Sequence, residues 1–119
     1  MKILVTGSNG LLGQKLTTLL NRDPSVYLIA TARGKSALPI NHGAFQSLDI
    51  TEQTAVTNIV ASTRPDVTIN TAAMTQVDQC ELERDACWKV NVTAVENLIN
   101  ASIANHVHLV HVSTDFIFD

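Results

Sequence analysis

The stretch TGSNGLLGQ, residues 6–14, follows a short apolar run and precedes a segment with leucines at helical spacing. Three of the chain's five glycines stand here, at positions 7, 10 and 13. Between a strand and a helix, Gly7 would permit a tight turn, Gly10 would let a pyrophosphate approach the backbone, and Gly13 would allow close helix–strand packing. The helix N-terminus would then face the phosphates. The same spacing also fits a purely structural turn in another α/β domain, so the remaining residues must decide.

Around this loop, predicted strands alternate with predicted helices. Apolar and β-branched runs predict strands over residues 2–6, 26–31, 44–48, 66–70 and 108–114. Helices are expected over residues 11–21, from Thr51 as N-cap to the stop at Arg64-Pro65, and from Asp78 to about Asn105. This alternation predicts an α/β domain with a Rossmann-like, doubly wound parallel sheet of about five strands and helices on both faces.

The segments that follow the predicted strands are expected to share one edge of the sheet. In such sheets, ligands bind at the carboxyl ends of the strands. The segments concerned are residues 7–13, 31–33, 49–50, 71–75 and 113–115. Their common location favours a nucleotide site as the purpose of the glycine loop.

Composition and charge exclude several classes of protein. A chain of 119 residues with 45% hydrophobic and 16% charged residues suits one globular domain. Its net charge of −3, with scattered basic residues, argues against a nucleic-acid partner. The first apolar run stops at Thr6, so no secretory signal is predicted, and no run is long enough to span a membrane.

The cysteines and histidines indicate neither a disulfide nor a metal site. Cys80 and Cys87 are seven residues apart, which on a helix separates them by about 10 Å, too far for a bridge. We therefore expect two reduced thiols and a cytoplasmic protein. The four histidines show no ligand spacing, so no metal is expected.

Five motifs, in sequence order, carry a family resemblance: TGSNGLLG, LDI, NTAAMTQVD, KVNVTAVENL and STDFIFD. Together they resemble the extended short-chain dehydrogenase/reductases and, within these, the dTDP-4-dehydrorhamnose reductase group. STDFIFD (113–119) is close to that group's S-T-D-Y-V-F-D, and AMTQVD (73–78) to its A-x-T-x-V-D. The resemblance covers all 119 residues, which correspond to the cofactor-binding first part of a family chain.

The resemblance implies cofactor-binding roles for residues at the predicted edge. Gly10, Leu11 and Leu12 would line the pyrophosphate. Asp49 and Ile50 would meet the adenine, with the carboxylate accepting from its amino group. The residues implied along the nicotinamide side are Ala72, Ala73, Met74 and Thr75. From the residues alone, Asp49 also fits a cap of the following helix.

The resemblance also implies residues near the reacting carbonyl. Thr114 would be the catalytic hydroxyl that hydrogen-bonds the substrate carbonyl, with Asp115 beside it on the substrate. Asn91 would support the geometry of the active site. The simpler readings stay open, namely a backbone-bonded hydroxyl at Thr114 and a locally satisfied helix residue at Asn91.

The end of the second predicted strand bears on cofactor choice. A carboxylate about 20 residues beyond the glycine loop would hold the ribose 2′-hydroxyl of NAD. Residues 30–34, Ala-Thr-Ala-Arg-Gly, contain none, whereas Arg33 suits a 2′-phosphate. NADP(H) is therefore favoured, and NAD(H) stays the alternative because Arg33 also fits a solvated loop.

By resemblance, the parent protein is an NAD(P)H-dependent reductase of a nucleotide-linked 4-keto sugar. The family's chemistry needs a Tyr-x-x-x-Lys pair, but Tyr27 is the only tyrosine and Thr31 stands where the lysine would be. We therefore expect residues 1–119 to be a partial NAD(P)-binding Rossmann domain, truncated on its C-terminal side and inactive alone. Its last strand would be an exposed edge, which favours a homo-oligomer.

Two other functions share this first half of the fold. One is a nucleotide-sugar epimerase or dehydratase, although those enzymes usually carry S-S-x-x-V-Y-G where this chain has STDFIFD. The other is a non-catalytic NADP-binding regulatory subunit resembling the methionine adenosyltransferase beta subunit, which has a similar S-D-Y-V-F-D stretch. A downstream Tyr-x-x-x-Lys would favour an enzyme, and its absence a regulator.

Overall fold

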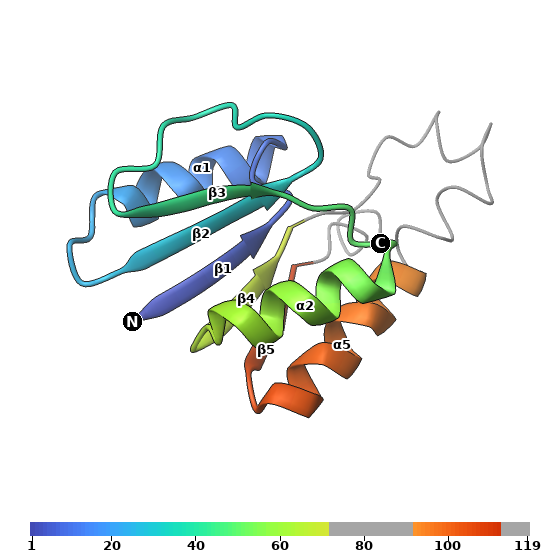
Figure 1. Cartoon of the computed structure of the whole chain (residues 1–119). Coiled ribbons are helices and arrows are strands. Elements are labelled where there is room, and N and C mark those ends of the chain that lie inside the picture. The colour runs from blue at the N-terminus through green and yellow to red at the C-terminus, as the bar shows by residue number, and fades with distance from the viewer. Residues whose placement is uncertain (72–91, 113–119) are drawn as a thin grey trace, which may run out of the picture.

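The computed structural model describes residues 1–71 and 92–112 and contains one five-stranded parallel sheet within them (Figure 1). Its strands lie in the order β3-β2-β1-β4-β5, and every neighbouring pair is parallel. The strands are β1 (Lys2–Thr6), β2 (Tyr27–Ala32), β3 (Gly43–Ser47), β4 (Val67–Asn70) and β5 (His108–His111). The order reverses at β1, which confirms the predicted Rossmann-like doubly wound sheet.

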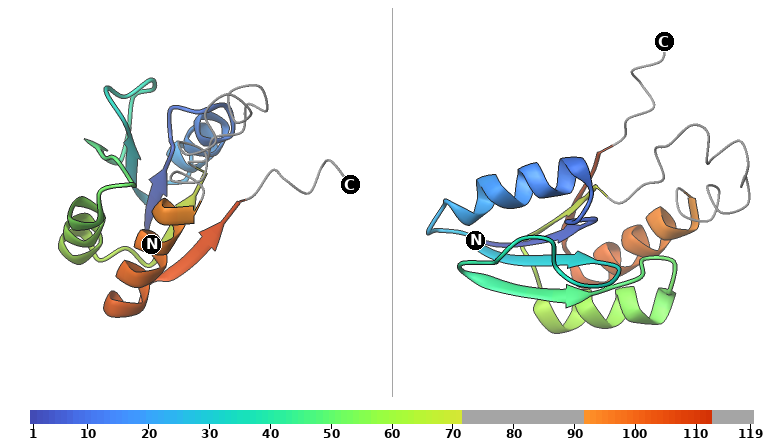
Figure 2. Two further views of the ribbon diagram at one scale, coloured as in Figure 1. Left: turned by 90° about the vertical axis from the view of Figure 1, so that its right-hand side faces the viewer. Right: turned by 90° about the horizontal axis from the view of Figure 1, so that it is seen from above.

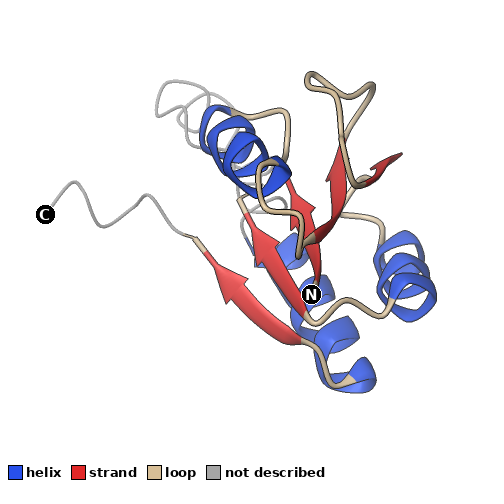
Figure 3. Ribbon diagram, turned by 90° about the vertical axis from the view of Figure 1, so that its left-hand side faces the viewer, coloured by secondary structure: helices blue, strands red, loops and turns tan. Residues whose placement is uncertain are grey.

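Helices cover both faces of the sheet (Figures 2 and 3). They are α1 (Leu11–Asn21), α2 (Gln53–Thr63) and α5 (Ala94–Asn105). The face under α1 is built from β1 and β2 residues such as Val5 and Leu28, with Leu16 of α1 packed against them. The opposite face forms a larger core whose buried members are Leu4, Ile29, Leu48, Ile50, Val56, Ile59, Val60, Ala94, Leu98 and Ala101.

The predicted elements agree with the described ones except at their ends. Thr51 is not the N-cap of α2, because its hydroxyl and its N–H both donate to Asp49 Oδ1, at 2.7 and 3.0 Å. Glu52 takes that position instead, without a side-chain cap. The last described strand, β5, ends at His111, and the Val112 N–H still donates to the Asn70 carbonyl at 3.0 Å. Residues 113–114 of the predicted strand lie outside the described part. Residues 78–91 of the predicted third helix lie outside the described part.

No helix in the described ranges is long and apolar enough to cross a bilayer.

Candidate functional site

The glycine loop turns sharply between β1 and α1. Gly7 has φ 77°, a left-handed conformation that residues with a side chain rarely adopt. A Cβ on Gly13 would lie 1.9 Å from the carbonyl oxygen of Gly7, so a side chain there would push α1 away from the strand end. The fold itself therefore requires glycine at both positions.

Gly10 differs from the other two glycines of the loop. Its φ of −73° and ψ of 171° suit any residue, and a Cβ would meet its nearest neighbour, the Gly7 carbonyl oxygen, at an ordinary 3.5 Å. Gly10 is exposed and stands at the N-cap of α1, where no side chain caps the helix. Nothing in the described structure needs glycine here.

The first turn of α1 combines backbone N–H groups that have no partner within the helix with two exposed apolar side chains. The first amides of a helix have no partner within the helix and carry its positive dipole end. Leu11 and Leu12 stand in this turn and are 78% and 43% exposed, although both are apolar. The predicted pyrophosphate residues thus meet at one exposed helix N-terminus, a place suited to an anion.

Neighbouring strand ends fasten the loop in place. The Thr71 hydroxyl, just after β4, donates to the carbonyl oxygens of Thr6 and Gly7 at 2.7 and 3.1 Å. On the other side, the Ser8 N–H donates to the Thr31 carbonyl at 3.0 Å. The loop is therefore tied to β4 and β2, the two strands that flank β1. Thr71 was expected at this edge because it follows a predicted strand, but its sequence position indicated no role.

A polar row crosses the same edge of the sheet on the α5 face. The Thr6 hydroxyl donates to Asn70 Oδ1, and Asn70 Nδ2 lies 3.0 Å from His111 Nδ1. The Asn70 side chain thus connects the Thr6 hydroxyl to the His111 ring. This row connects the ends of β1, β4 and β5, and only Val112 separates β5 from the STDFIFD motif.

Asp49 and Ile50 follow β3 in a turn that is held from two sides. The Asp49 carboxylate accepts from both the N–H and the hydroxyl of Thr51, and its carbonyl accepts from the Glu52 N–H at 3.0 Å. Asn97, buried on α5, donates from Nδ2 to the Ile50 carbonyl at 3.0 Å. Sequence reasoning missed Asn97, whose only signal was an amide side chain next to the apolar stripe of its helix.

Arg33 stands directly after β2 and is exposed. It makes no hydrogen bond or ion pair with any other residue that the structure describes. The remaining predicted site residues lie outside the described ranges, and they are Ala72, Ala73, Met74, Thr75, Asn91, Thr114 and Asp115. Within the same ranges, no group of three or more His, Cys, Asp or Glu side chains gathers where a metal ion would be held.

The reversal of strand order at β1, with the glycine loop there and loop residues 49–50 along the same edge, defines an α/β protein with a Rossmann-like fold. The chain belongs to the family described as the RmlD substrate binding domain, whose model matches residues 1–119.

Individual proteins similar to this chain include dTDP-4-dehydrorhamnose reductases. The chain is 38% identical over 118 residues to a dTDP-4-dehydrorhamnose reductase of Aggregatibacter actinomycetemcomitans, covering 99% of this chain and 36% of that protein. A solved hypothetical dTDP-4-dehydrorhamnose reductase of Sulfolobus tokodaii superposes with a TM-score of 0.80 at 35% identity, over 100% of this chain and 41% of that one.

A third relative was solved with a ligand. It is a dTDP-4-dehydrorhamnose reductase of Bacillus anthracis in complex with NADP, with a TM-score of 0.66 and 28% identity over 91% of this chain and 34% of that one. The present chain therefore spans somewhat more than a third of the length of such relatives.

Proposed function

We propose that residues 1–119 are the NAD(P)-binding portion of a reductase that acts on a nucleotide-linked 4-keto sugar. The similar proteins named dTDP-4-dehydrorhamnose reductase support the reaction class. The observation that carries the proposal is Gly10, the one loop glycine whose missing side chain the fold does not require. Its small size leaves room for a pyrophosphate against the first turn of α1.

The residues at this edge fit a bound dinucleotide. The exposed N-terminus of α1, with Gly10, Leu11 and Leu12, would hold the pyrophosphate through backbone N–H groups. The turn of Asp49 and Ile50 would receive the adenine. When bound, the nicotinamide supplies the hydride for carbonyl reduction.

The groups that act on the substrate stay predictions. Thr114 is proposed to hydrogen-bond the carbonyl, Asp115 to contact the substrate, Asn91 to support the active site and residues 72–75 to follow the nicotinamide. Residues 1–119 contain no Tyr-x-x-x-Lys pair. The homo-oligomer and the cytoplasmic location also stay predictions.

We further propose a preference for NADP(H) over NAD(H). Residues 30–34 offer no carboxylate to hold a ribose 2′-hydroxyl, and the exposed Arg33 offers a guanidinium for a 2′-phosphate. The complex of the Bacillus anthracis relative with NADP agrees with this choice.

Calorimetric titration of the intact protein with NADPH and NADH tests the preference. Replacing Arg33 by alanine removes a charged hydrogen bond worth about 1.5–3 kcal/mol, so NADPH affinity should fall about 10- to 150-fold while NADH affinity is unchanged. Equal affinity of the unmodified protein for both cofactors would refute the preference. Binding of neither would refute the nucleotide site itself.

A further inference from the structure

The connection from β2 to β3 runs back beside α1 (Figures 1 and 2), and two asparagine side chains at the ends of that helix hold it there. Asn9, just before α1, donates from Nδ2 to the Lys35 carbonyl at 2.6 Å and accepts at Oδ1 from the Ala37 N–H at 2.8 Å. Each bond of this pair goes to backbone, as between neighbouring strands. Asn9 therefore fixes the path of the loop and not one of its side chains.

Asn21, the last residue of α1, makes the same kind of pair further along the connection. Its Nδ2 donates to the Pro39 carbonyl at 2.8 Å, and its Oδ1 accepts from the Asn41 N–H at 3.2 Å. The two asparagines thus provide chemically matched attachments at opposite ends of one helix. Only Asn9 lies within the glycine loop.

Asn9 is itself held from the helix side. Gln14 of α1 donates from Nε2 to the Asn9 carbonyl at 2.6 Å, and the Gly10 N–H donates to the Gly7 carbonyl at 3.1 Å. The glycine loop therefore holds Asn9 in place, and the two bonds from Asn9 to Lys35 and Ala37 form a clamp on the β2–β3 connection. Moving that connection at Lys35 would break one of these bonds.

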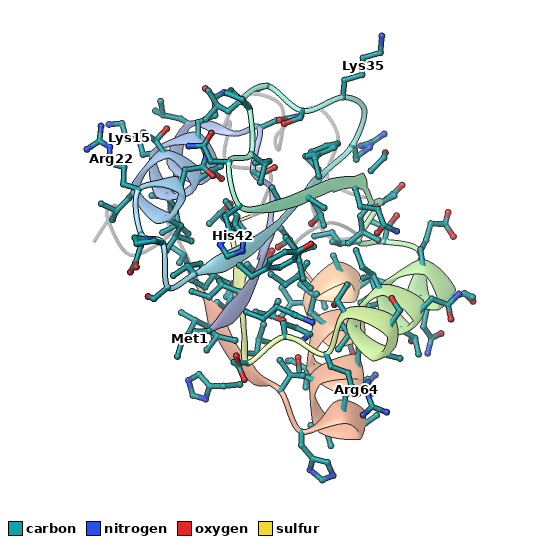
Figure 4. All side chains as sticks on the ribbon, turned by 60° about the vertical axis from the view of Figure 1, so that its left-hand side comes forward. Met1, Lys15, Arg22, Lys35, His42 and Arg64 are labelled. Atoms are coloured by element: carbon teal, nitrogen blue, oxygen red, sulfur yellow. The ribbon has the colours of Figure 1, made fainter. Side chains whose placement is uncertain are left out.

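Arg33 lies between two points at which the glycine loop holds the connection. Ser8 binds the carbonyl of Thr31, two residues before Arg33, and Asn9 binds that of Lys35, two residues after it. The guanidinium of Arg33 therefore extends from a short segment, residues 31–35, that is fixed at both ends. This segment lies next to the loop proposed to hold the pyrophosphate. The side chain of Lys35 instead points away from the rest of the protein (Figure 4).

We propose that Asn9 is a positioning residue for cofactor discrimination, which fixes residues 33–37 so that Arg33 reaches a 2′-phosphate. This inference rests on the proposed NADP(H) preference. A loop that is already ordered spares the bound state the entropy of ordering it, so the guanidinium contact retains more of its strength. Asn9 would act on the 2′-phosphate through Arg33 and not through the pyrophosphate.

The test is calorimetric titration of the intact protein with NADPH and with NADH, comparing Asn9→Ala with the matched control Asn21→Ala. Both variants lose one clamp of two backbone hydrogen bonds. We expect Asn9→Ala to lower the ratio of NADPH to NADH affinity about tenfold, the effect of about 1.4 kcal/mol. Asn21→Ala should leave that ratio unchanged. The thermal stability of Asn21→Ala should fall by about as much as that of Asn9→Ala, because each variant loses two hydrogen bonds to backbone.

Two further variants separate positioning from general damage. In an Arg33→Ala background, Asn9→Ala should change the affinity ratio no further, because the group through which it acts is gone. Ala37→Pro removes the N–H that donates to Asn9 Oδ1 and leaves the glycine loop unchanged. It should therefore also lower the ratio of NADPH to NADH affinity.

The outcomes distinguish this inference from the proposal beneath it. If the unmodified protein shows no preference for NADPH, the role of Arg33 and the role of Asn9 are both wrong. If the preference exists and Arg33→Ala abolishes it, but Asn9→Ala and Ala37→Pro retain it, only the inference about Asn9 is overturned. An equal loss of the ratio in Asn21→Ala would likewise overturn it.

Discussion

Replacing Gly10 with alanine should separate the ligand's demands on the glycine loop from those of the fold. The added methyl would stand 3.5 Å from the Gly7 carbonyl oxygen, an ordinary contact, on a backbone that alanine adopts freely. Alanine is a poorer N-cap than glycine, which costs about 0.5–1 kcal/mol, but it restricts the unfolded chain by a similar amount. The free energy of unfolding should therefore change by less than about 1 kcal/mol.

Binding should respond much more strongly than stability. The methyl occupies the space through which a pyrophosphate would reach the first turn of α1, so at least one charged hydrogen bond to a backbone N–H is lost. Such a bond is worth about 1.5–3 kcal/mol, which corresponds to a 10- to 150-fold weaker affinity for NADPH. Calorimetric titration measures that affinity, and urea unfolding without cofactor measures stability.

Gly13→Ala is the contrasting variant. Its methyl would overlap the Gly7 carbonyl oxygen at 1.9 Å, so the end of β1 and the start of α1 would have to separate. Overpacking of this severity should cost about 3 kcal/mol or more. The reasoning is refuted if Gly10→Ala binds NADPH as tightly as the unmodified protein, or if it loses as much stability as Gly13→Ala.

Two substitutions on the α5 face give opposite expectations. Asn97→Leu leaves the Ile50 carbonyl without its 3.0 Å donor, so the free energy of unfolding measured in urea should fall by about 1–3 kcal/mol. Calorimetry should also show weaker NADPH binding. Unchanged stability and binding would contradict the role of Asn97. Thr68→Val replaces a buried hydroxyl that has no hydrogen-bond partner in the described structure, so stability should rise by about 1 kcal/mol, and a fall would contradict this account.

The sheet could be predicted because its signal is local. β2 reads as a continuous apolar run, and all its residues after Tyr27 are buried between the two helical layers. Even β3, whose residues are mostly exposed, was placed within one residue of its observed ends. The N-cap of α2 was misplaced because Thr51 had a competing partner in Asp49, two residues earlier, which the sequence did not rank above helix capping.

Sheet topology predicts which loops gather at the edge of the sheet that carries the site, but it does not predict the side chains that hold those loops. The glycine loop directly follows β1, and residues 49–50 follow β3 after one residue, so a parallel sheet brings both to one edge. Asn9 instead bonds residues 26 and 28 positions away, and Asn97 bonds one 47 positions away. No periodicity connects such pairs.

The amide chemistry of Asn9, Asn21 and Asn97 explains how these residues hold loops and why the sequence did not reveal that role. An amide side chain carries a donor and an acceptor, so it can replace a missing strand neighbour beside an irregular backbone. Asn9 and Asn21 do this for the connection after β2, and Asn97 donates to the turn after β3. Loops held in this way through their backbone can vary in side chain without losing their path. Cofactor preference could then change by substitution at a position such as Arg33, while the supporting asparagines remain in place.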